Sequence, residues 1–402
     1  MGCLVAGVAS AQTTITLATY GSANAELKAW QQIGAAFTQS HPDVKVDVQV
    51  FAFGDYVDKI VAMSAAGAPP DIFQTWAQYK PNWADNGLIA DISNLWKTSS
   101  VIADANIYPF MRDTTVYNGR YYGIPFDYNT EVWFLDADML DGAGLDEPGA
   151  HWTVADLRQM GQKMSHPEQK IYGVADAANW GWGDNIQWMK NWSGHGWLNE
   201  DRTKVAVDDP KVTEMLQYWY DNTYGLNITP PAGVTAAKIG AQQGWLSYMF
   251  NYTANTPNYN WRLATFPAVP GGGQKDFAQG HMFSLAAHAA HSQAALTFLE
   301  WMASPAGQKA IVQYAQTEPI TPAPELWNAF YNLLPADRVA YVRQWMTNVL
   351  YGQEAYADTF QYWNSFGKLN DIMIKHLNNI FVDKKAIGNE LKQAAVEMQA
   401  AL

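Results

Sequence analysis

Four consecutive residues, Phe126, Asp127, Tyr128 and Asn129, combine aromatic rings with a carboxylate and an amide. They stand between two extended apolar stretches, the first of which begins at Asn118-Gly119, a Gly turn with aromatic and β-branched flanks that predicts a hairpin. Pro125 cannot donate a ladder hydrogen bond, so one continuous central strand through this region is not expected. A polar and aromatic link of this kind suits a crossing between two lobes, with its side chains facing the gap. An ordinary strand, turn and strand within one domain is the alternative, and these residues alone fit both.

Motifs for other chemistries are weak or absent in the sequence. His288 and His291 have the spacing of a metal pair on a helix, but no Cys or nearby Glu completes a zinc site. The sequence contains no phosphate-binding Walker A motif, no nucleophile elbow and no dinucleotide-binding fingerprint. We therefore expect no metal site and no cofactor.

Length and composition point to a folded protein of two domains. The chain has 402 residues, more than one hydrophobic core usually fills. Its residues are 48% hydrophobic, with 18 Trp and 21 Tyr, which excludes a disordered chain. The net charge of −13 argues against a nucleic-acid partner.

Residues 1–11 are interpreted as the remnant of a secretory signal. Ala9-Ser10-Ala11 has the small residues of a signal-peptidase site, which would leave Gln12 first. Gly2-Cys3 could instead be the remnant of a lipoprotein signal with Cys3 as the lipid anchor, and a cloning start is a third interpretation. Cys3 is the only cysteine, so no intrachain disulfide is expected. No later run of 18 apolar residues predicts a membrane span.

The first part of the chain predicts a parallel sheet. Strands and helices alternate there, with strands at 13–20, 44–53 and 71–76 and helices at 26–39 and 55–66. This β-α-β-α-β order implies helices on both faces of a mainly parallel sheet. Ligands of such sheets bind beyond the carboxyl ends of the strands, here at 20–24 and 76–79. Asn24 is also a candidate helix cap.

The same alternation returns beyond the link at Asp127, which favours a second α/β lobe. Helices are predicted at 153–164, 210–220, 239–249, 293–302, 336–351, 355–382 and 386–402, and strands at 171–175, 263–269 and 282–286. A segment with five Trp, 180–197, lies between them. Most Trp residues are expected in the core, among them Trp30, Trp96, Trp188, Trp192, Trp219, Trp301 and Trp345.

Several stretches in order along nearly the whole chain resemble the extracellular solute-binding proteins of carbohydrate ABC importers, the group that contains the maltose-binding protein. They are TITLATYG, HPDVKVDV, AAGAPPDIF, NGLIADISNLW, NGRYYGIPFDYNTEVWFLDADML, WTVADL, FPAVPGGG and ALTFLEWMASPAGQKA. The resemblance implies an α/β, two-lobe periplasmic-binding-protein fold with a hinge of crossing segments and a sugar held between the lobes. It implies an N-terminal lobe of 12–126 with 277–318 and a C-terminal lobe of 127–276 with 319–402. Hinge segments are expected near Asp127, 273–277 and Pro319.

The resemblance also implies a set of ligand-binding residues. These are Ser22, Asn24, Trp76, Gln78, Tyr79, Asp127, Asn129, Trp180, Trp182, Asp184, Asn185, Tyr252 and Trp363, with Phe366 as a further candidate. The G-x-A-M motif that often precedes the Tyr252 position in the family is replaced here by Gly244-Trp245-Leu246-Ser247-Tyr248-Met249. Such residue types suit a sugar, since a flat ring covers its C–H face and planar polar groups bind its hydroxyls.

The function that the resemblance implies is a receptor that captures a mono- or oligosaccharide and delivers it to the permease subunits of an ABC importer. Such a receptor is a non-enzymatic monomer that is periplasmic or extracellular, either free or anchored to the cell membrane by a lipid. A secreted glycoside hydrolase, with two carboxylates flanking the scissile bond, is an alternative. A binding protein for a non-sugar solute, such as a polyamine or a small peptide, is another. Replacement of Trp76 by Ala is expected to weaken sugar binding at least tenfold.

Overall fold

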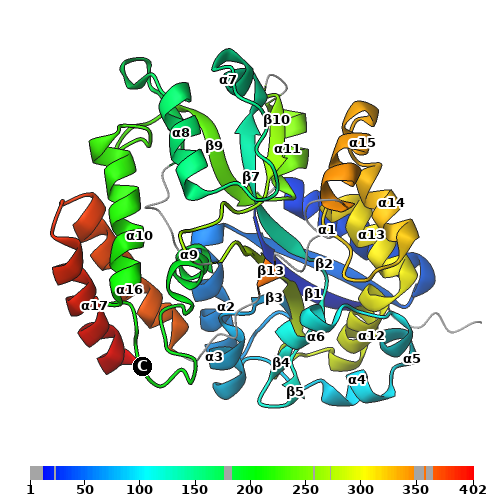
Figure 1. Ribbon diagram of the computed structural model, residues 1–402. Helices are drawn as coiled ribbons and strands as arrows, with labels where there is room; N and C mark the ends of the chain where they lie inside the picture. Colours follow the sequence, from blue (N-terminus) through cyan, green and yellow to red (C-terminus); the bar gives the residue numbers. More distant parts are fainter. Residues whose placement is uncertain are drawn as a thin grey trace, which may run out of the picture. The chain divides into compact units, whose positions relative to one another are not determined.

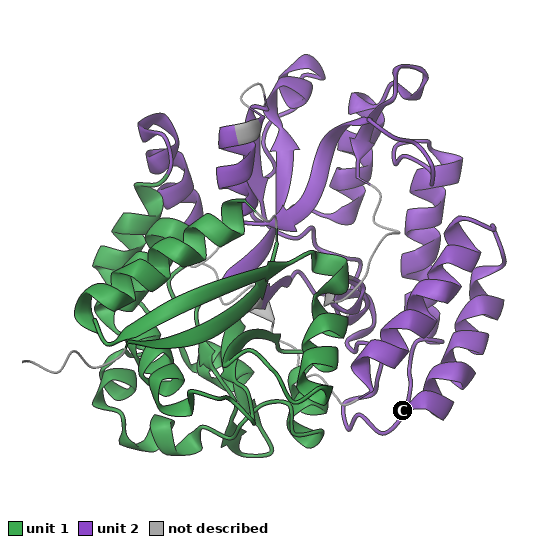
Figure 2. Ribbon diagram, turned by 180° about the vertical axis from the view of Figure 1, so that it is seen from behind, with its two compact units in different colours: residues 1–128, 280–333 green, residues 129–279, 334–402 purple. Residues whose placement is uncertain are grey.

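The chain forms two compact units, each assembled from two separate stretches (Figure 2). Unit 1 comprises Met1–Tyr128 and Gly280–Leu333, and unit 2 comprises Asn129–Gln279 and Leu334–Leu402. The computed structural model describes residues 12–21, 24–175, 183–256, 259–271, 273–347, 357–358 and 365–402. The chain passes from one unit to the other directly after Tyr128, within the polar and aromatic link.

Residues 319–333, which the resemblance assigns to the second lobe, cluster with unit 1. The amide of Tyr108 donates to the carbonyl of Ile320 at 3.0 Å. The indole Nε1 of Trp327 donates to the hydroxyl of Tyr108 at 3.2 Å. Helix α14 (Pro324–Tyr331) is thereby tied to the segment at Tyr108, which lies well inside unit 1.

Unit 1 is built on a five-stranded sheet in the order β2-β1-β3-β12-β6. Its strands are β1 (Thr13–Tyr20), β2 (Val44–Phe51), β3 (Ile72–Trp76), β6 (Ile124–Pro125) and β12 (His281–Leu285). Strand β1 runs parallel to both β2 and β3, which confirms the predicted parallel core, and β12 is antiparallel to β3. The edge position of β6 explains why Pro125 is tolerated, since its outer side needs no donor.

Helices cover this sheet (Figure 1). The helical segments of unit 1 are α1 (Ala25–Ser40), η1 (Phe53–Asp55), α2 (Tyr56–Ala65), α3 (Lys80–Asp85), α4 (Ser93–Thr98), α5 (Ser100–Asp104), α6 (Pro109–Thr114), α12 (Ser292–Ala303), α13 (Pro305–Ala315) and α14. On α1 the buried residues Trp30, Ile33 and Phe37 recur at helical spacing. Their contacts with β12 and α12 include the rings of Phe283 and Phe298.

A two-residue turn at Asn118-Gly119 connects β4 (Val116–Tyr117) with β5 (Arg120–Tyr121). Both turn residues have positive φ, 48° and 72°, as a type I′ hairpin requires. The predicted hairpin is therefore confirmed. The chain then reaches β6 and, after Phe126, Asp127 and Tyr128, enters the long strand of unit 2, so the interruption predicted at Pro125 is confirmed as well.

Unit 2 is built on a second sheet in the order β13-β11-β7-β9-β8, with β10 also paired to β7. Its strands are β7 (Asn129–Asp136), β8 (Ile171–Val174), β9 (Lys238–Trp245), β10 (Trp261–Ala264), β11 (Asp276–Gln279) and β13 (Ala357–Asp358). All eight residues of β7 are buried, as expected of a central strand. Strands β8 and β9 run parallel, whereas β7 is antiparallel to β9.

The helices of unit 2 are mostly the predicted ones. They are α7 (Ala137–Gly142), α8 (Val154–Met164), η2 (Pro167–Gln169), α9 (Gly183–Ser193), α10 (Pro210–Tyr220), the π-helical turn η3 (Asp221–Gly225), α11 (Tyr248–Asn255), α15 (Ala336–Trp345), α16 (Phe366–Phe381) and α17 (Ile387–Ala401). Thr153 and Asp156 form a reciprocal capping box at the start of α8. The Asp209 side chain caps α10 by accepting from the amide of Lys211.

Two helix predictions in unit 2 are wrong. The segment 239–249 is chiefly strand β9, because it pairs with β7 on one side and β8 on the other, and a helix begins only at Tyr248. Gly240 permits this packing, since a Cβ there would lie 2.8 Å from Met164 Cε. The helix expected over 355–382 begins at Phe366, and residues 357–358 form a short strand instead.

Across the described ranges, no helix combines the length and the apolar character that crossing a bilayer requires.

Candidate ligand-binding site

Two aromatic residues meet where the parallel strands of unit 1 end. Tyr20 is the last residue of β1 and Trp76 the last residue of β3. Their ring centroids lie 4.8 Å apart in an edge-to-face arrangement. Because ligands of open α/β sheets bind beyond the carboxyl ends of the strands, this corner is the first candidate site of unit 1.

Three more rings surround Trp76. The centroids of Phe53, Tyr56 and Tyr79 lie 5.5, 5.5 and 5.7 Å from the Trp76 ring. The Tyr56 hydroxyl is fully buried and donates to the carbonyl of Gln74 at 2.6 Å, which fixes its ring below the cluster. These residues and Tyr20 form what we call the unit 1 aromatic cluster.

A carboxylate and an imidazole lie in contact beside the aromatic cluster. Asp127 accepts the backbone N–H of His281 at 2.6 Å through Oδ1, and its Oδ2 lies 2.7 Å from the ring Nδ1. His281 is also the register partner of Trp76 across β12 and β3, and its ring lies 6.5 Å from that of Tyr20. Both side chains are buried, so Asp127 orients the imidazole at the end of the sheet.

Two carboxyl groups, those of Glu26 and Asp127, influence the pKa values in this corner. Burial raises the pKa of Glu26, the charge of Asp127 raises it further, and His281 opposes the shift. Burial also raises the pKa of Tyr20, again with a contribution from Asp127. Tyr20 therefore keeps its proton at neutral pH and can donate a hydrogen bond.

Unit 2 presents a comparable edge. Strands β8 and β9 are parallel, and β9 ends at the half-buried Trp245. Glu131 near the start of β7 is the register partner of Trp245. Asn129, the first residue of β7, therefore lies at the edge of the sheet where β9 ends. The Asn129 amide donates to Ser247 Oγ at 3.0 Å, and Tyr248, with 42% of its surface exposed, follows directly.

A buried polar network underlies the unit 2 edge. Gln243 donates its amide N–H to the carboxylate of Glu131 and accepts from Trp188 Nε1 at 3.0 Å. Glu131 and Trp188 are both buried. Because each atom of the Gln243 amide is engaged, its orientation is fixed. The edge can thus offer polar groups whose geometry is set before any ligand arrives.

Several predicted site residues lie outside the described residues. They are Ser22, Trp180, Trp182 and Trp363. Asp184 belongs to helix α9, but its side chain is not described. The ligand role of these residues stays a prediction.

The other predicted residues fall into different settings. Asn24 stands at the N-cap position of α1, but its side chain makes no capping bond, so the cap prediction is wrong. Asn185 is fully buried and accepts from Trp197 Nε1 at 2.6 Å. Gln78 is buried next to Tyr79. Tyr252 is half-buried on α11 and stands edge-on to Phe134 at 5.0 Å, with burial raising its pKa to about 12.

Most Trp residues expected in the core are there. Trp30, Trp188, Trp192, Trp219, Trp301 and Trp345 are all buried. Trp96 is half-buried, stacks on Tyr121 at 4.4 Å and donates to the carbonyl of Gly123. The additional candidate Phe366 is buried against Trp197, with ring centroids 5.5 Å apart.

The sequence reasoning did not identify Phe53, Tyr56 or His281 as members of this corner. His281 lies far from Asp127 in the chain, and the antiparallel pairing of β12 with β6 brings the two together. Phe53 carried a usable signal, because it is the last residue of the strand predicted at 44–53 and lies two residues beyond the observed end of β2. The same strand-end rule that selected Trp76 would have found it.

No group of three or more His, Cys, Asp or Glu side chains that could hold a metal ion occurs in the part of the chain that the structure describes. His291 instead contacts Asp71, whose Oδ2 lies 3.3 Å from the ring Nδ1. The arrangement at the two edges is thus one of rings, amides and carboxylates.

Comparison with known proteins places this arrangement in a family. An uncharacterized lipoprotein of Streptomyces antibioticus is 28% identical over 157 residues, which cover 37% of this chain and 34% of that relative. The match therefore spans about a third of that relative's length.

Solved structures are similar over nearly the whole chain. The ABC substrate-binding protein Lmo0181 of Listeria monocytogenes, in complex with cycloalternan, has a TM-score of 0.85 at 19% identity, covering 97% of this chain and 98% of its own. An ABC transporter solute-binding protein of Thermotoga lettingae bound with alpha-D-tagatose has a TM-score of 0.80 at 17% identity, covering 97% and 100%. These similarities confirm the two-lobe periplasmic-binding-protein fold. Residues 21–309 match the family of bacterial extracellular solute-binding proteins, and the chain belongs to that family.

Proposed function

We propose that this protein is a receptor that binds a mono- or oligosaccharide and delivers it to an ABC importer, without catalysing a reaction. The observation that carries the proposal is the unit 1 aromatic cluster beside the Asp127–His281 pair. Rings suit the C–H faces of a sugar, and oriented polar groups suit its hydroxyls. The similar Listeria and Thermotoga proteins bind carbohydrates, which supports the same class of ligand here.

The proposal extends to partners and location. The partners are the permease subunits of the importer, and the receptor acts as a monomer. It works outside the cytoplasmic membrane, in the periplasm or tethered to the membrane by a lipid at Cys3, as the lipoprotein relative suggests.

Thermal stabilisation by a carbohydrate panel tests the ligand class. We would incubate the purified protein with maltose, mannobiose, mannotriose, alpha-D-tagatose and cycloalternan, and record the melting temperature at rising concentrations. A true ligand stabilises the folded state in proportion to the logarithm of its concentration over Kd. Spermidine and a tripeptide serve as the non-sugar arms.

The same samples separate a receptor from a hydrolase. Chromatography of each sugar after prolonged incubation should show the input sugar unchanged, with saturable one-to-one binding by calorimetry. Release of smaller sugars would identify a glycoside hydrolase and contradict the proposal. If only spermidine or the peptide stabilises the protein, the proposed carbohydrate ligand is contradicted, whereas the proposed receptor function is not.

A further inference from the structure

The rings of the unit 1 aromatic cluster differ sharply in exposure. Trp76 is 3% exposed and Tyr56 is fully buried, whereas Phe53 has 51% of its surface exposed. A sugar can lie flat only on a ring that reaches solvent. We propose that Phe53, and not Trp76, is the ring of unit 1 on which the sugar lies, an inference that rests on the proposed carbohydrate function.

The position of Phe53 along the chain places it at the ligand edge of the sheet. Tyr20 and Phe51 end β1 and β2 as register partners. Phe53 follows two residues later, in the 3-10 turn η1. It therefore stands just beyond the carboxyl end of β2, at the edge of the sheet where α/β proteins bind their ligands.

The buried rings beneath Phe53 hold it outward. Its centroid lies 5.3 Å from that of Tyr20, edge to face, and 5.5 Å from that of Trp76. The space below is already filled by these rings and by Tyr56, which itself lies 5.6 Å from Tyr20. A ring that is fixed in this way loses little conformational freedom when a ligand binds, so more of the contact energy appears as affinity.

Polar groups also lie close to Tyr20. The His281 ring is 6.5 Å from the Tyr20 ring and is held by Asp127. The carboxyl of Glu26 interacts electrostatically with both Asp127 and His281. A pyranose presents an apolar C–H face and a belt of hydroxyls, so a ring with acceptors and donors nearby favours a sugar over a protein partner as the occupant of Phe53.

Calorimetry with ring-altering variants tests the inference. The probe is whichever sugar of the panel stabilises the wild-type protein most. We expect Phe53→Ala to weaken its binding about tenfold. Phe53→Leu, which is apolar but not flat, should also lose affinity, whereas Phe53→Tyr should stay within about threefold of wild type. Val61→Ala is the matched control, because Val61 is exposed on the neighbouring helix α2 but lies outside the cluster.

The outcomes separate this inference from the proposed function. Loss of affinity in Phe53→Ala and Phe53→Leu with an unchanged melting temperature supports the inference. If Phe53→Ala binds the sugar with the same affinity as Val61→Ala and wild type, the role of Phe53 is overturned but the receptor function stands. A wild-type protein that binds no sugar of the panel overturns both. Full sugar affinity in Phe53→Ala together with loss of importer stimulation would assign Phe53 to permease docking instead.

Discussion

Asp127 holds His281 through both of its carboxylate oxygens. One oxygen accepts the backbone N–H at 2.6 Å and the other lies 2.7 Å from the imidazole Nδ1. Asp127 precedes the passage from unit 1 to unit 2 after Tyr128, and His281 directly follows the return at Gly280. The pair therefore fastens two crossing stretches of the chain to each other within unit 1.

A double-mutant cycle should reveal strong coupling in this pair. Asp127→Ala leaves the His281 donors without their acceptor. Asp127→Ala and His281→Ala should each lose about 1 to 3 kcal/mol of unfolding free energy. The double variant should lose clearly less than the sum, with a coupling of about 1 kcal/mol or more. Urea unfolding provides the measurement. The exposed pair Asp91–Arg120, 3.7 Å apart, is the control and should couple by less than about 0.5 kcal/mol. Equal coupling in both pairs would contradict a special role for Asp127.

Trp76→Ala should destabilise the protein as well as alter binding. The indole is 3% exposed and packed among Tyr20, Phe53, Tyr56 and Tyr79. Its removal leaves a cavity, which costs about 3 to 5 kcal/mol at buried Trp positions. Thermal unfolding of Trp76→Ala should show a markedly lower melting temperature than that of wild type. Trp96→Ala, at a half-buried site, should cost less, and a Trp76→Ala protein that melts like wild type would show that this indole is not a core residue.

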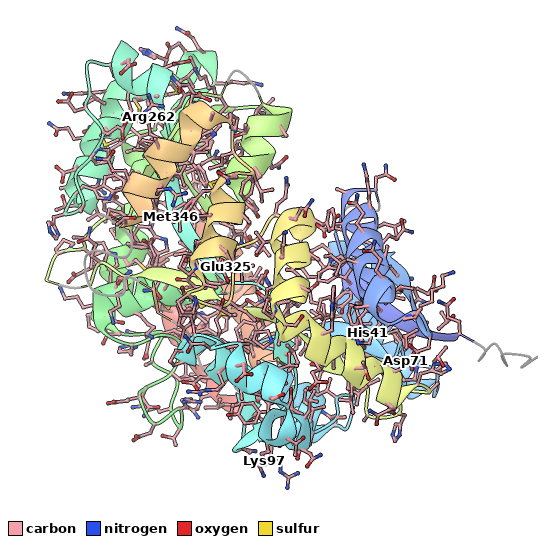
Figure 3. The ribbon with its side chains drawn as sticks, turned by 90° about the vertical axis from the view of Figure 1, so that its right-hand side faces the viewer. His41, Asp71, Lys97, Arg262, Glu325 and Met346 are labelled. Carbon is pink, nitrogen blue, oxygen red and sulfur yellow. The ribbon has the colours of Figure 1, made fainter. Side chains whose placement is uncertain are left out.

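Asp71 should make stability depend on pH in acid. It accepts from the N–H and hydroxyl of Thr16 and from the N–H of His291, and lies beside α12 in unit 1 (Figure 3). Burial alone raises the pKa of Asp71, but these hydrogen bonds outweigh burial, so the pKa is lowered. A lowered carboxyl pKa contributes stability above the unfolded-state pKa of about 4, and this contribution is lost as pH falls through the folded-state pKa.

Asp71→Asn is the corresponding variant. Its amide can accept at only one position and would turn an N–H toward a donor, so we expect a loss of about 1 to 3 kcal/mol at pH 7. The difference in free energy of unfolding between wild type and Asp71→Asn should become smaller as the pH is lowered below about 4. Chemical unfolding at pH 7, 5 and 3 measures it. A gap that stays constant down to pH 3 would mean that the charge of Asp71 contributes nothing.

Lys80 should give a pH dependence of the same sign, but in the alkaline range. Burial lowers its pKa to about 7, against a small opposing effect of Asp113. Its amine donates to the carbonyl of Thr114. Between pH 7 and 10 the unfolded chain therefore holds a proton at Lys80 that the folded protein lacks, so this residue's contribution to stability rises with pH.

Lys80→Met removes that contribution. The free energy of unfolding of wild type minus that of Lys80→Met should increase by about 2 kcal/mol or more between pH 6 and pH 10. Comparing the two proteins at each pH cancels the titration of all other groups. Lys97→Met, at an exposed lysine, is the control and should show no such trend (Figure 3). If the difference from wild type is independent of pH for Lys80→Met as well as for Lys97→Met, Lys80 is charged in the folded protein.

Local patterns predicted the parts of the fold that local chemistry decides. The hairpin at Asn118-Gly119 and the capping box at Thr153 were readable because turn and cap residues act on their own neighbours. Segment 239–249 was not, since pairing with β7 and β8 overrides a helical spacing of apolar residues.

The candidate site was predictable only in part for the same reason. Trp76 ends a strand of the recognised parallel sheet and Tyr79 follows it closely, so the strand-end rule finds both. His281 enters the site through long-range strand pairing, which no local pattern of sequence reports. Burial also separates Trp76 from Phe53, and exposure depends on neighbours from β1 and α2 that the sequence alone does not bring together.

Strand β12 lies between β3 and β6 in the first sheet, although it is encoded after most of unit 2. During translation, β3 therefore emerges from the ribosome with one edge unpaired and must wait for residues 281–285. Unit 2 has its central strands β7, β8 and β9 available before that time. The nascent chain thus carries an open, apolar strand edge for much of its synthesis, which is the kind of surface that chaperones protect.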